Sequence, residues 1–312
     1  MVSLKRYLIK RLLSIVPLLL GISFLSFILI NLSESDPAEV ALRVNEITPT
    51  ETAVSEMREE LGLDNPFLER YMTWLTNSIK GDFGTSFINN KPVIEEIGQA
   101  LPATLLLAFA SFLIIFVISI GASIICTLYE GSMLDRGIRA LVFIGEAMPG
   151  YWIGLLLMWF FSIKLDLLPT SGMSSWTSVI LPAVTLAFAY ISTYVRLMRN
   201  NMVQNKGENF VLYAKARGLK GRIILKRICK NSLQSTITAL GMSIPKLIAG
   251  TVIVENIFAW PGIGRLSVTA ILNYDYPVIQ AYVFLMAVLF VVCNLLVDIV
   301  TASIDPRMRK EA

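Results

Sequence analysis

Four long uncharged runs constrain this chain more than any other feature. They extend from Leu12 to Ser33, from Ile97 to Tyr129, from Leu167 to Val195 and from Tyr276 to Val297. A helix of about 20 apolar residues crosses the roughly 30 Å hydrocarbon core of a bilayer. Backbone groups in lipid must bond to one another, which favours helices. The pattern therefore predicts an all-α membrane protein.

Two further apolar runs are interrupted by charge. Ala140 to Ile163 contains Glu146, and Asn231 to Phe258 contains Lys246 and Glu255. Counting them gives six predicted transmembrane helices. The prolines in these runs are expected at helix starts or kinks: Pro17, Pro102, Pro149, Pro182 and Pro245. Only 16% of the residues are charged, against about 25% in soluble proteins, which argues against a water-soluble enzyme.

Basic residues in short connecting segments predict the orientation. The segments that would share one side carry 19 of the 27 lysines and arginines, namely Lys5, Arg6, Lys10, Arg11, Arg136, Arg139, ten between Arg196 and Lys230, and Arg307, Arg309 and Lys310. Both termini are therefore expected in the cytoplasm. The first run is longer than a signal-peptide core and lacks an Ala-x-Ala site, so we expect a retained anchor.

The charge pattern also divides the chain. We expect an N-terminal transmembrane helix (1–33), an external loop subdomain (34–96), a transmembrane core (97–304) with a cytoplasmic loop (200–230), and a cytoplasmic tail (305–312). The external loop carries 13 acidic and 5 basic residues.

Turn signals predict two short helices in the external loop. The motif from Thr48 to Glu51 resembles a capping box with a proline at the first helical position, and the helix would end at Gly62. A second helix would begin at Asn65-Pro66 and end near Gly81. Its apolar stripe is expected to pack on the membrane core, with docking of an external partner as the alternative: Leu68, Tyr71, Met72 and Leu75.

The segment from Arg196 to Lys230 holds ten basic residues and one acid, Glu208. Charge alone indicates a solvated loop that contacts anionic membrane lipid. A purely solvated loop gains nothing, however, from Phe210, Leu212 and Tyr213. We therefore predict a short amphipathic helix that ends at Gly218 and inserts into a groove on a partner.

At this segment the chain resembles the permease subunits of bacterial ABC importers of the dipeptide, oligopeptide and nickel type. That family's cytoplasmic loop reads roughly Glu-Ala-Ala, three residues, Gly, nine residues, Ile-x-Leu-Pro. Here Ala214, Gly218 and Ile228 match, whereas Leu212 and Tyr213 replace Glu and Ala, and Lys230-Asn231 replaces Leu-Pro.

Further segments carry the resemblance over nearly the whole chain, namely 81–86 (GDFGTS), 101–104 (LPAT), 255–265 (ENIFAWPGIGR), 275–280 (DYPVIQ) and 305–307 (DPR). The resemblance implies the type I ABC importer permease fold in a bacterial cytoplasmic membrane. The implied partners are a second permease subunit, two ATP-binding subunits and an extracytoplasmic solute-binding protein. No nucleic acid is expected.

The residue types argue against an enzyme. The chain has no histidine and no Gly-Lys pair, and its cysteines are scattered, so neither a Ser-His-Asp set nor a phosphate-binding loop is expected. We predict no catalytic, cofactor-binding or metal-ligating residues. The predicted ATPase-coupling residues are Glu208, Phe210, Tyr213, Ala214, Ala216, Arg217 and Gly218, and the pathway candidates are the charges in or near spans, Glu146, Lys246, Glu255 and Asp298.

The substrate prediction favours nickel or another transition metal carried as a chelate. The segments 168–172 and 258–261 look similar to nickel and metallophore permeases, and a bare metal ion would find no imidazole ligand here. A dipeptide or oligopeptide is the alternative. Two other classes stay open, an ion-coupled secondary transporter and a structural subunit of a respiratory complex. The first predicts inverted repeats, of which the sequence shows no convincing example, and the second leaves the segment from Phe210 to Gly218 unexplained.

Overall fold

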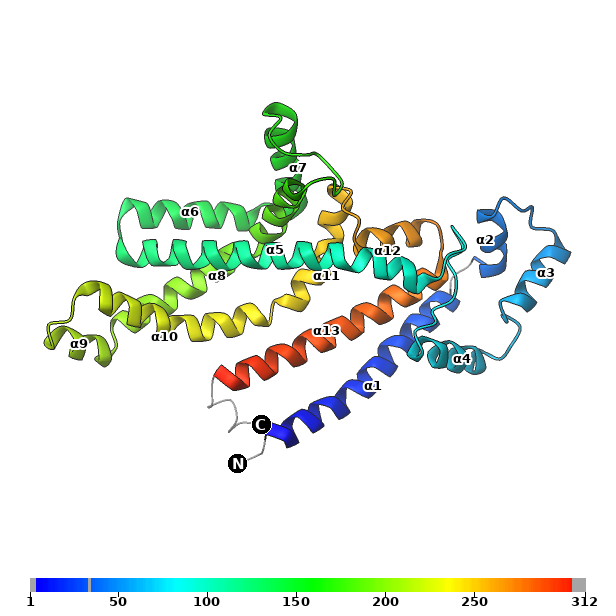
Figure 1. Cartoon of the computed structure of the whole chain (residues 1–312), viewed down its shortest axis with the longest axis horizontal. Helices are drawn as coiled ribbons and strands as arrows, with labels where there is room; N and C mark the ends of the chain where they lie inside the picture. The colour runs from blue at the N-terminus through cyan, green and yellow to red at the C-terminus, as the bar shows by residue number, and fades with distance from the viewer. Residues whose placement is uncertain (1–3, 33–34, 305–312) are drawn as a thin grey trace. The chain divides into compact units, whose positions relative to one another are not determined.

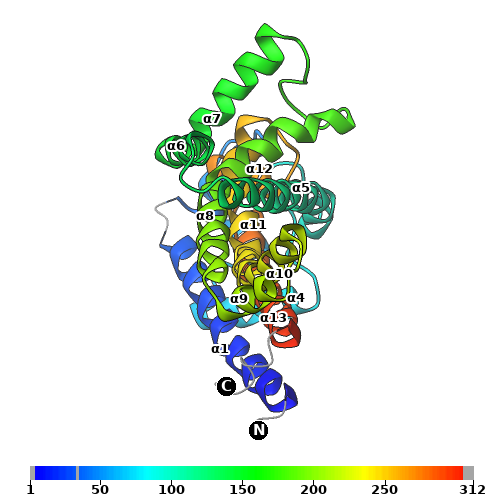
Figure 2. The same ribbon diagram turned by 90° about the vertical axis from the view of Figure 1, so that its left-hand side faces the viewer.

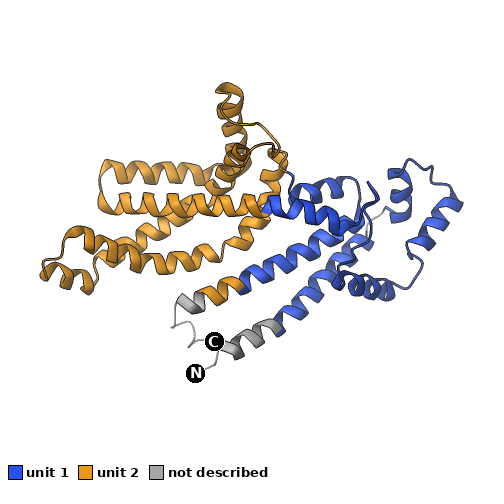
Figure 3. Ribbon diagram, viewed as in Figure 1, with its two compact units in different colours: residues 1–104, 261–295 blue, residues 105–260, 296–312 orange. Residues whose placement is uncertain are grey.

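The computed structural model describes residues 4–32 and 35–304, with side chains for residues 13–32 and 35–300. The chain divides into two compact units, coloured separately in Figure 3. Unit 1 contains residues 1–104 and 261–295, and unit 2 contains residues 105–260 and 296–312. The predicted tail at 305–312, with Arg307, Arg309 and Lys310, lies outside the described residues.

Long helices dominate the described part of the chain (Figure 1). Four are long and apolar enough to cross a membrane, namely α1 (Leu4–Asn31), α5 (Val93–Leu128), α8 (Ile180–Lys206) and α13 (Tyr276–Ile304). Two bent pairs also qualify when each pair counts as one span, which gives up to six spans. This confirms the all-α membrane fold.

The bent pairs coincide with the two runs that charge interrupts. In the first pair, α6 (Met133–Ala147) is followed at 107° by α7 (Gly150–Leu157) and the π-helix η1 (Met158–Lys164). In the second pair, α10 (Gly221–Gly241) meets α11 (Ile244–Ile257) at 54°. Pro149 and Pro245 stand at the two breaks. Because proline cannot donate a backbone hydrogen bond, each break falls where the helical ladder is interrupted.

The uncharged run from Leu167 to Val195 becomes helical later than its sequence suggests. Residues 167–175 are not helical, and a 3-10 turn η2 (Trp176–Val179) leads into α8. Pro169, Gly172 and several serines favour irregular backbone here. Within unit 2, α8 then packs against α6, α7, α10 and α11.

Unit 1 contains the loop between α1 and α5, which folds into α2 (Pro37–Val44), α3 (Glu51–Glu60) and α4 (Phe67–Ile79). The two predicted helices are confirmed, but the predicted cap is wrong: Thr50, not Thr48, caps α3 by accepting the Ala53 N–H. Sequence analysis also missed α2, which Asp36 caps through the Ala38 N–H.

Aromatic packing fixes α4 on α1. Tyr71 is buried, its ring lies 5.1 Å from that of Phe24, and its hydroxyl bonds to Ser23 over 2.9 Å. The packing prediction is wrong for Leu68 and Met72, which are more than half exposed. Tyr71 therefore lies on the buried face of α4, whereas Leu68 and Met72 lie on its exposed face.

Asp275, which is completely buried, ties two distant segments of unit 1 together. Its carboxylate accepts hydrogen bonds from the Ser86 hydroxyl (2.5 Å) and the Phe87 N–H (3.2 Å). Thr104 in turn accepts the Ile263 N–H at the start of α12 (Ile263–Leu272). The Asp275 bonds hold the loop segment before α5 on the turn before α13, and the Thr104 bond joins α5 to the start of α12.

Candidate functional site: a seated helix on the basic segment

The predicted amphipathic helix is present as α9 (Asn209–Ala216). Figures 1 and 2 show it at the end of unit 2 where α8 and α10 meet. Glu208 stands at its start in extended conformation. After the helix, the Leu219 N–H bonds to the Ala214 carbonyl, and Gly218 adopts a φ of +68°. That left-handed conformation is the glycine stop that the sequence predicts.

An apolar core holds α9 in place. Val211 and Ala214 on the inner face are 2% exposed. They pack in one cluster with residues of α8 and α10, namely Met198, Met202, Ile224 and Ile228, and Phe210 is partly buried against that cluster. A close-packed cluster of this kind transmits displacement instead of absorbing it. Any force applied to α9 would therefore reach α8 and α10.

The outer face of α9 carries the residues that a partner could contact. Leu212 is 65% exposed and Tyr213 is 70% exposed. Ala216 and Arg217 are exposed as well. Large apolar side chains on a basic surface are typical of protein interfaces more than of solvated loops. The predicted coupling residues thus fall into two groups. Phe210 and Ala214 pack inward against α8 and α10, whereas Tyr213, Ala216 and Arg217 are exposed.

Polar contacts join the helices beside α9. Arg199 of α8 binds Asp135 of α6 through two hydrogen bonds of 3.0 Å, and Arg139 lies 3.3 Å from the same carboxylate. The Asp135 side chain is completely buried. Lys206 pairs with Glu130 over 2.8 Å. Sequence analysis missed the Asp135–Arg199 pair, although Asp135 is one of few acids between the second and third spans.

The pathway candidates have different surroundings. Glu146 pairs with Arg196 (3.0 Å) and accepts a hydrogen bond from Ser192 (2.7 Å). Both Lys246 and Glu255 lie on α11, but Lys246 is exposed and Glu255 is completely buried. Asp298 is partly buried on α13. All four lie in unit 2, where they differ in exposure and in their polar partners.

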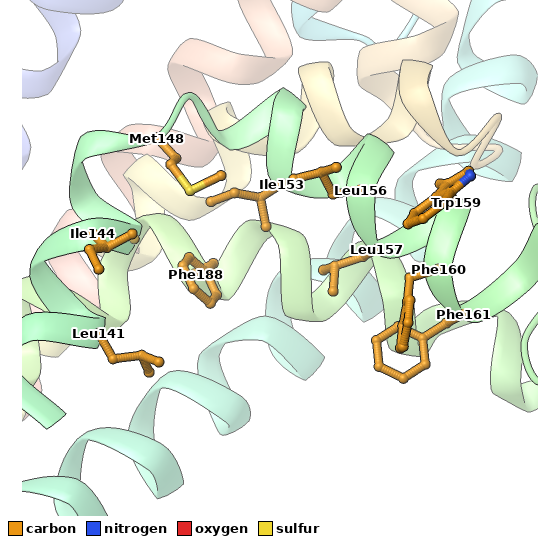
Figure 4. A pocket seen from close by; sticks show the side chains of 11 residues that line it. Leu141, Ile144, Met148, Ile153, Leu156, Leu157, Trp159, Phe160, Phe161 and Phe188 are labelled. Carbon is orange, nitrogen blue, oxygen red and sulfur yellow. The ribbon is translucent and has the colours of Figure 1, made fainter. Parts of the chain in front are cut away.

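A separate cavity of 380 Å³ lies in unit 2 among α6, α7, η1 and α8. Figure 4 shows its walls, which include Leu141, Met148, Ile153, Phe160 and Phe188. All of its lining residues are apolar, aromatic or glycine. Such walls offer no ion pair to a charged substrate, so this cavity is not a candidate for metal or peptide binding.

The helical membrane fold and the seated α9 together define a class, the membrane subunit of a transporter whose driving subunits are separate proteins. Residues 119–310 match the family described as "Binding-protein-dependent transport system inner membrane component". Residues 4–108 match the N-terminal region described for the same kind of component. The chain belongs to this family, and it is an ABC importer permease of the peptide and nickel branch.

Curated relatives cover almost the entire chain. The metal-staphylopine import system permease protein CntB of Staphylococcus aureus (strain NCTC 8325 / PS 47) is 40% identical over 98% of this chain and 99% of its own length. The oligopeptide transport system permease protein AppB of Bacillus subtilis (strain 168) is 37% identical over 97% and 98%. The glutathione permease GsiC of Pectobacterium atrosepticum is 36% identical over 97% and 98%.

A solved structure shows the same fold. The inward-facing MetNI methionine ABC transporter superposes with a TM-score of 0.57 at 16% identity, over 67% of this chain and 96% of that one. These relatives are transport subunits and not enzymes, as predicted. Importer permeases of this kind work with ATP-binding subunits and a substrate-binding protein.

Proposed function

We propose that this permease forms half of a pathway that imports a transition metal, such as nickel, as a complex with a small chelator. The observation that carries the proposal is the lack of side chains that could bind a bare metal ion. The chain contains no histidine, and the described residues contain no group of three Cys, Asp or Glu placed to hold a metal ion. A metal that is already coordinated needs no such ligands. The similarity to a metal-staphylopine permease supports the same substrate class.

A peptide substrate is the second candidate. The relatives named for oligopeptide and glutathione transport favour it, at only slightly lower identity. Uptake of radiolabelled nickel by cells that express the complete system separates the two. The metal should enter with staphylopine or a related chelator and not as the free ion, and dipeptides should not compete. Competition by dipeptides, together with chelator-independent background uptake, would favour the peptide reading.

We also propose that α9 faces the cytoplasm and receives the motion of two ATP-binding subunits. In this proposal Glu208, Phe210, Tyr213, Ala214, Ala216, Arg217 and Gly218 form the coupling element. A second permease subunit completes the pathway, and a solute-binding protein delivers substrate to the opposite side, which is the side expected for the 34–96 loop. Exposed Tyr213 and buried Val211 and Ala214 support this arrangement.

The orientation has a direct test. A single cysteine at Tyr213, in a chain whose own three cysteines are replaced, should react with a membrane-impermeant thiol reagent in inside-out vesicles and not in intact cells. Tyr213 is suitable because its side chain is largely exposed. Labelling from the outside of intact cells would place α9 on the other face and end the coupling proposal.

We propose that Glu255 supports the pathway from α11, because it is completely buried in a predicted span. Its own carbonyl also accepts the Trp260 N–H over 2.8 Å, at the start of the turn that leads to α12. Glu255→Gln keeps the shape and removes the charge. It should lower uptake, whereas unchanged uptake and unchanged stability would make the charge incidental. Glu146, Lys246 and Asp298 remain proposed pathway residues on the same grounds of charge within spans.

A further inference from the structure

A second cavity, of 270 Å³, lies within unit 1 where α1 ends and α13 begins. Its walls include Phe27 and Asn31 of α1, Arg70 and Trp74 of α4, and Gln280 of α13. None of these residues belongs to the coupling element or to the pathway candidates. The cavity mixes an aromatic wall with polar side chains, which distinguishes it from the apolar cavity in unit 2.

Arg70 is the one charged residue among those that line this cavity. Its guanidinium donates to the Leu63 carbonyl over 3.4 Å and lies 6.0 Å from the Phe27 ring. The carboxylates of Asp36 and Asp64 bind Arg58 instead, at 2.6 and 3.0 Å. Within the described residues, no carboxylate lies within ion-pair distance of Arg70. Burial, followed by the charge of Arg58, lowers the pKa of Arg70, and a bound anion would relieve both effects.

Hydrogen-bond donors accompany this charge. The Trp74 indole N–H is buried and meets no acceptor among the described residues. The carboxamides of Asn65, Asn77 and Gln280 also line the cavity, and the structure of residues 35–304 records no hydrogen bond for them. A guanidinium, an indole N–H and three carboxamides can satisfy an anion with several oxygen atoms, such as a phosphate.

The position of the cavity identifies the source of the phosphate. The described part of α1 is strongly apolar, and only 17% of its span is buried within the protein. Lipid acyl chains can therefore lie along α1, past exposed Leu25 and Leu29. Trp74 lies on α4, which packs on α1 through Tyr71, and tryptophan is enriched at the level of lipid head groups. The volume equals that of roughly nine waters at about 30 Å³ each, which leaves room for a glycerophosphate.

We propose that this cavity binds the phosphodiester head group of an anionic membrane phospholipid, with Arg70 as the counter-charge and Trp74 as a donor. Arg70 is the positive charge of this cavity, in a loop that carries 13 acidic and 5 basic residues. The bound lipid would join α1, α4 and the start of α13 at the membrane surface.

The test measures lipid binding to the full-length permease, purified in its complete complex. Phosphatidylglycerol, phosphatidylcholine and free sn-glycerol 3-phosphate are added in turn, and bound lipid is counted by native mass spectrometry. Phosphatidylglycerol should bind at least fivefold more tightly than phosphatidylcholine. Arg70→Gln should abolish that preference, and Arg70→Lys should retain most of it. The matched control is Arg43→Gln on α2, an exposed arginine of the same loop that does not line the cavity.

A second variant, Trp74→Phe, tests the same cavity independently of whether Arg70→Gln folds. Trp74→Phe keeps a ring to contact Tyr71 and Phe284 but removes the indole N–H, and it should weaken phosphatidylglycerol binding about threefold. An unchanged lipid preference in both Arg70→Gln and Trp74→Phe would overturn the proposal. Binding of glycerol phosphate as tight as that of the lipid would overturn the lipid source.

Discussion

Two regions outside the predicted spans are built in opposite ways. In unit 2, two buried apolar residues of α9 pack against four from α8 and α10. In unit 1, polar contacts hold much of the loop between α1 and α5: Arg58 bridges Asp36 and Asp64, and Asp275 binds Ser86 and Phe87. Because the apolar cluster in unit 2 is close-packed, α9 moves together with α8 and α10. The loop between α1 and α5 also borders the cavity beside Arg70.

The difference separates two kinds of task. A helix that transmits motion must not shift against its support, which the 2% exposure of Val211 and Ala214 satisfies. A surface that receives ligands needs accessible polar groups, which the loop supplies. The comparison therefore predicts that variants on the outer face of α9 affect assembly and transport, whereas variants in the exposed ion pairs of Arg58 affect local stability only slightly.

The outer face of α9 offers the largest expected effect. Replacing Leu212 and Tyr213 together by alanine should weaken binding of the ATP-binding subunits by roughly 100-fold. The reason is that truncating a central interface anchor commonly costs about 2 kcal/mol or more, and about 1.4 kcal/mol is a factor of ten. Titration of the purified ATP-binding subunits against the solubilised permease measures the change.

The control for this variant is Ile79→Ala, which truncates an equally exposed apolar residue at the end of α4. Its binding of ATP-binding subunits should equal that of the unmodified chain. Equal losses for both variants would remove the distinction between the two regions.

The buried ion pair next to α9 should give the second effect. Asp135→Asn leaves Arg199, whose side chain is 16% exposed, without its main counter-charge. A buried charged group that loses its partner costs about 2 to 3 kcal/mol. The midpoint of thermal unfolding of the solubilised permease should fall accordingly. Arg139→Gln removes the exposed partner of the same carboxylate and should cost less than about 1 kcal/mol. Similar shifts of the unfolding midpoint for both variants would show that burial of the arginine does not matter here.

Gly218 tests the end of α9. Its φ of +68° lies in the left-handed region, where a side chain costs about 1 to 2 kcal/mol, although no neighbouring atom lies within 4 Å of the place that a Cβ would occupy. Gly218→Val should therefore strain the stop and lower the number of substrate molecules imported per ATP hydrolysed. Gly221→Val is the matched control, because that glycine has ordinary φ and equally open surroundings. A normal transport ratio in Gly218→Val would contradict the coupling proposal.

Local signals explain what the sequence predicted well. Uncharged runs identify the spans, prolines identify both breaks, and Gly218 identifies the end of α9, because each depends only on nearby residues. Irregular backbone at 167–175 was less visible, since that segment is uncharged like the helix that follows it. Helix α2 was missed although Asp36-Pro37 is a start signal, because its eight residues are too few to show a helical period clearly.

The polar contacts could not be predicted in the same way. Asp135 and Arg199 are 64 residues apart, and Glu146 and Arg196 are 50 apart, so only the packing of α6 on α8 brings them together. The sequence shows ten basic residues between Arg196 and Lys230 without distinguishing the one that is buried against a carboxylate. Likewise, helical spacing placed Leu68 and Tyr71 on one stripe, but only the aromatic side chains of α1 decide that Tyr71 is the buried member.

The smallest effect is expected in the acidic loop. Arg58→Gln removes the ion pairs to Asp36 and Asp64, but the Arg58 side chain is 38% exposed, so the loss should stay within about 1 kcal/mol. Hydrogen bonds, first to Asp36 and then to Asp64, raise the pKa of Arg58 above its ordinary value. A raised pKa stabilises the fold at every pH below the ordinary value, and this stabilisation disappears only as the pH rises through the folded-state pKa. The stability difference between Arg58→Gln and the unmodified chain should therefore stay constant from about pH 6 to pH 9, measured by thermal unfolding at each pH.

Arg43→Gln, which breaks a more exposed pair with Glu39, should cost less still. A loss above about 2 kcal/mol for Arg58→Gln would show that polar ties hold this loop as firmly as the apolar cluster holds α9.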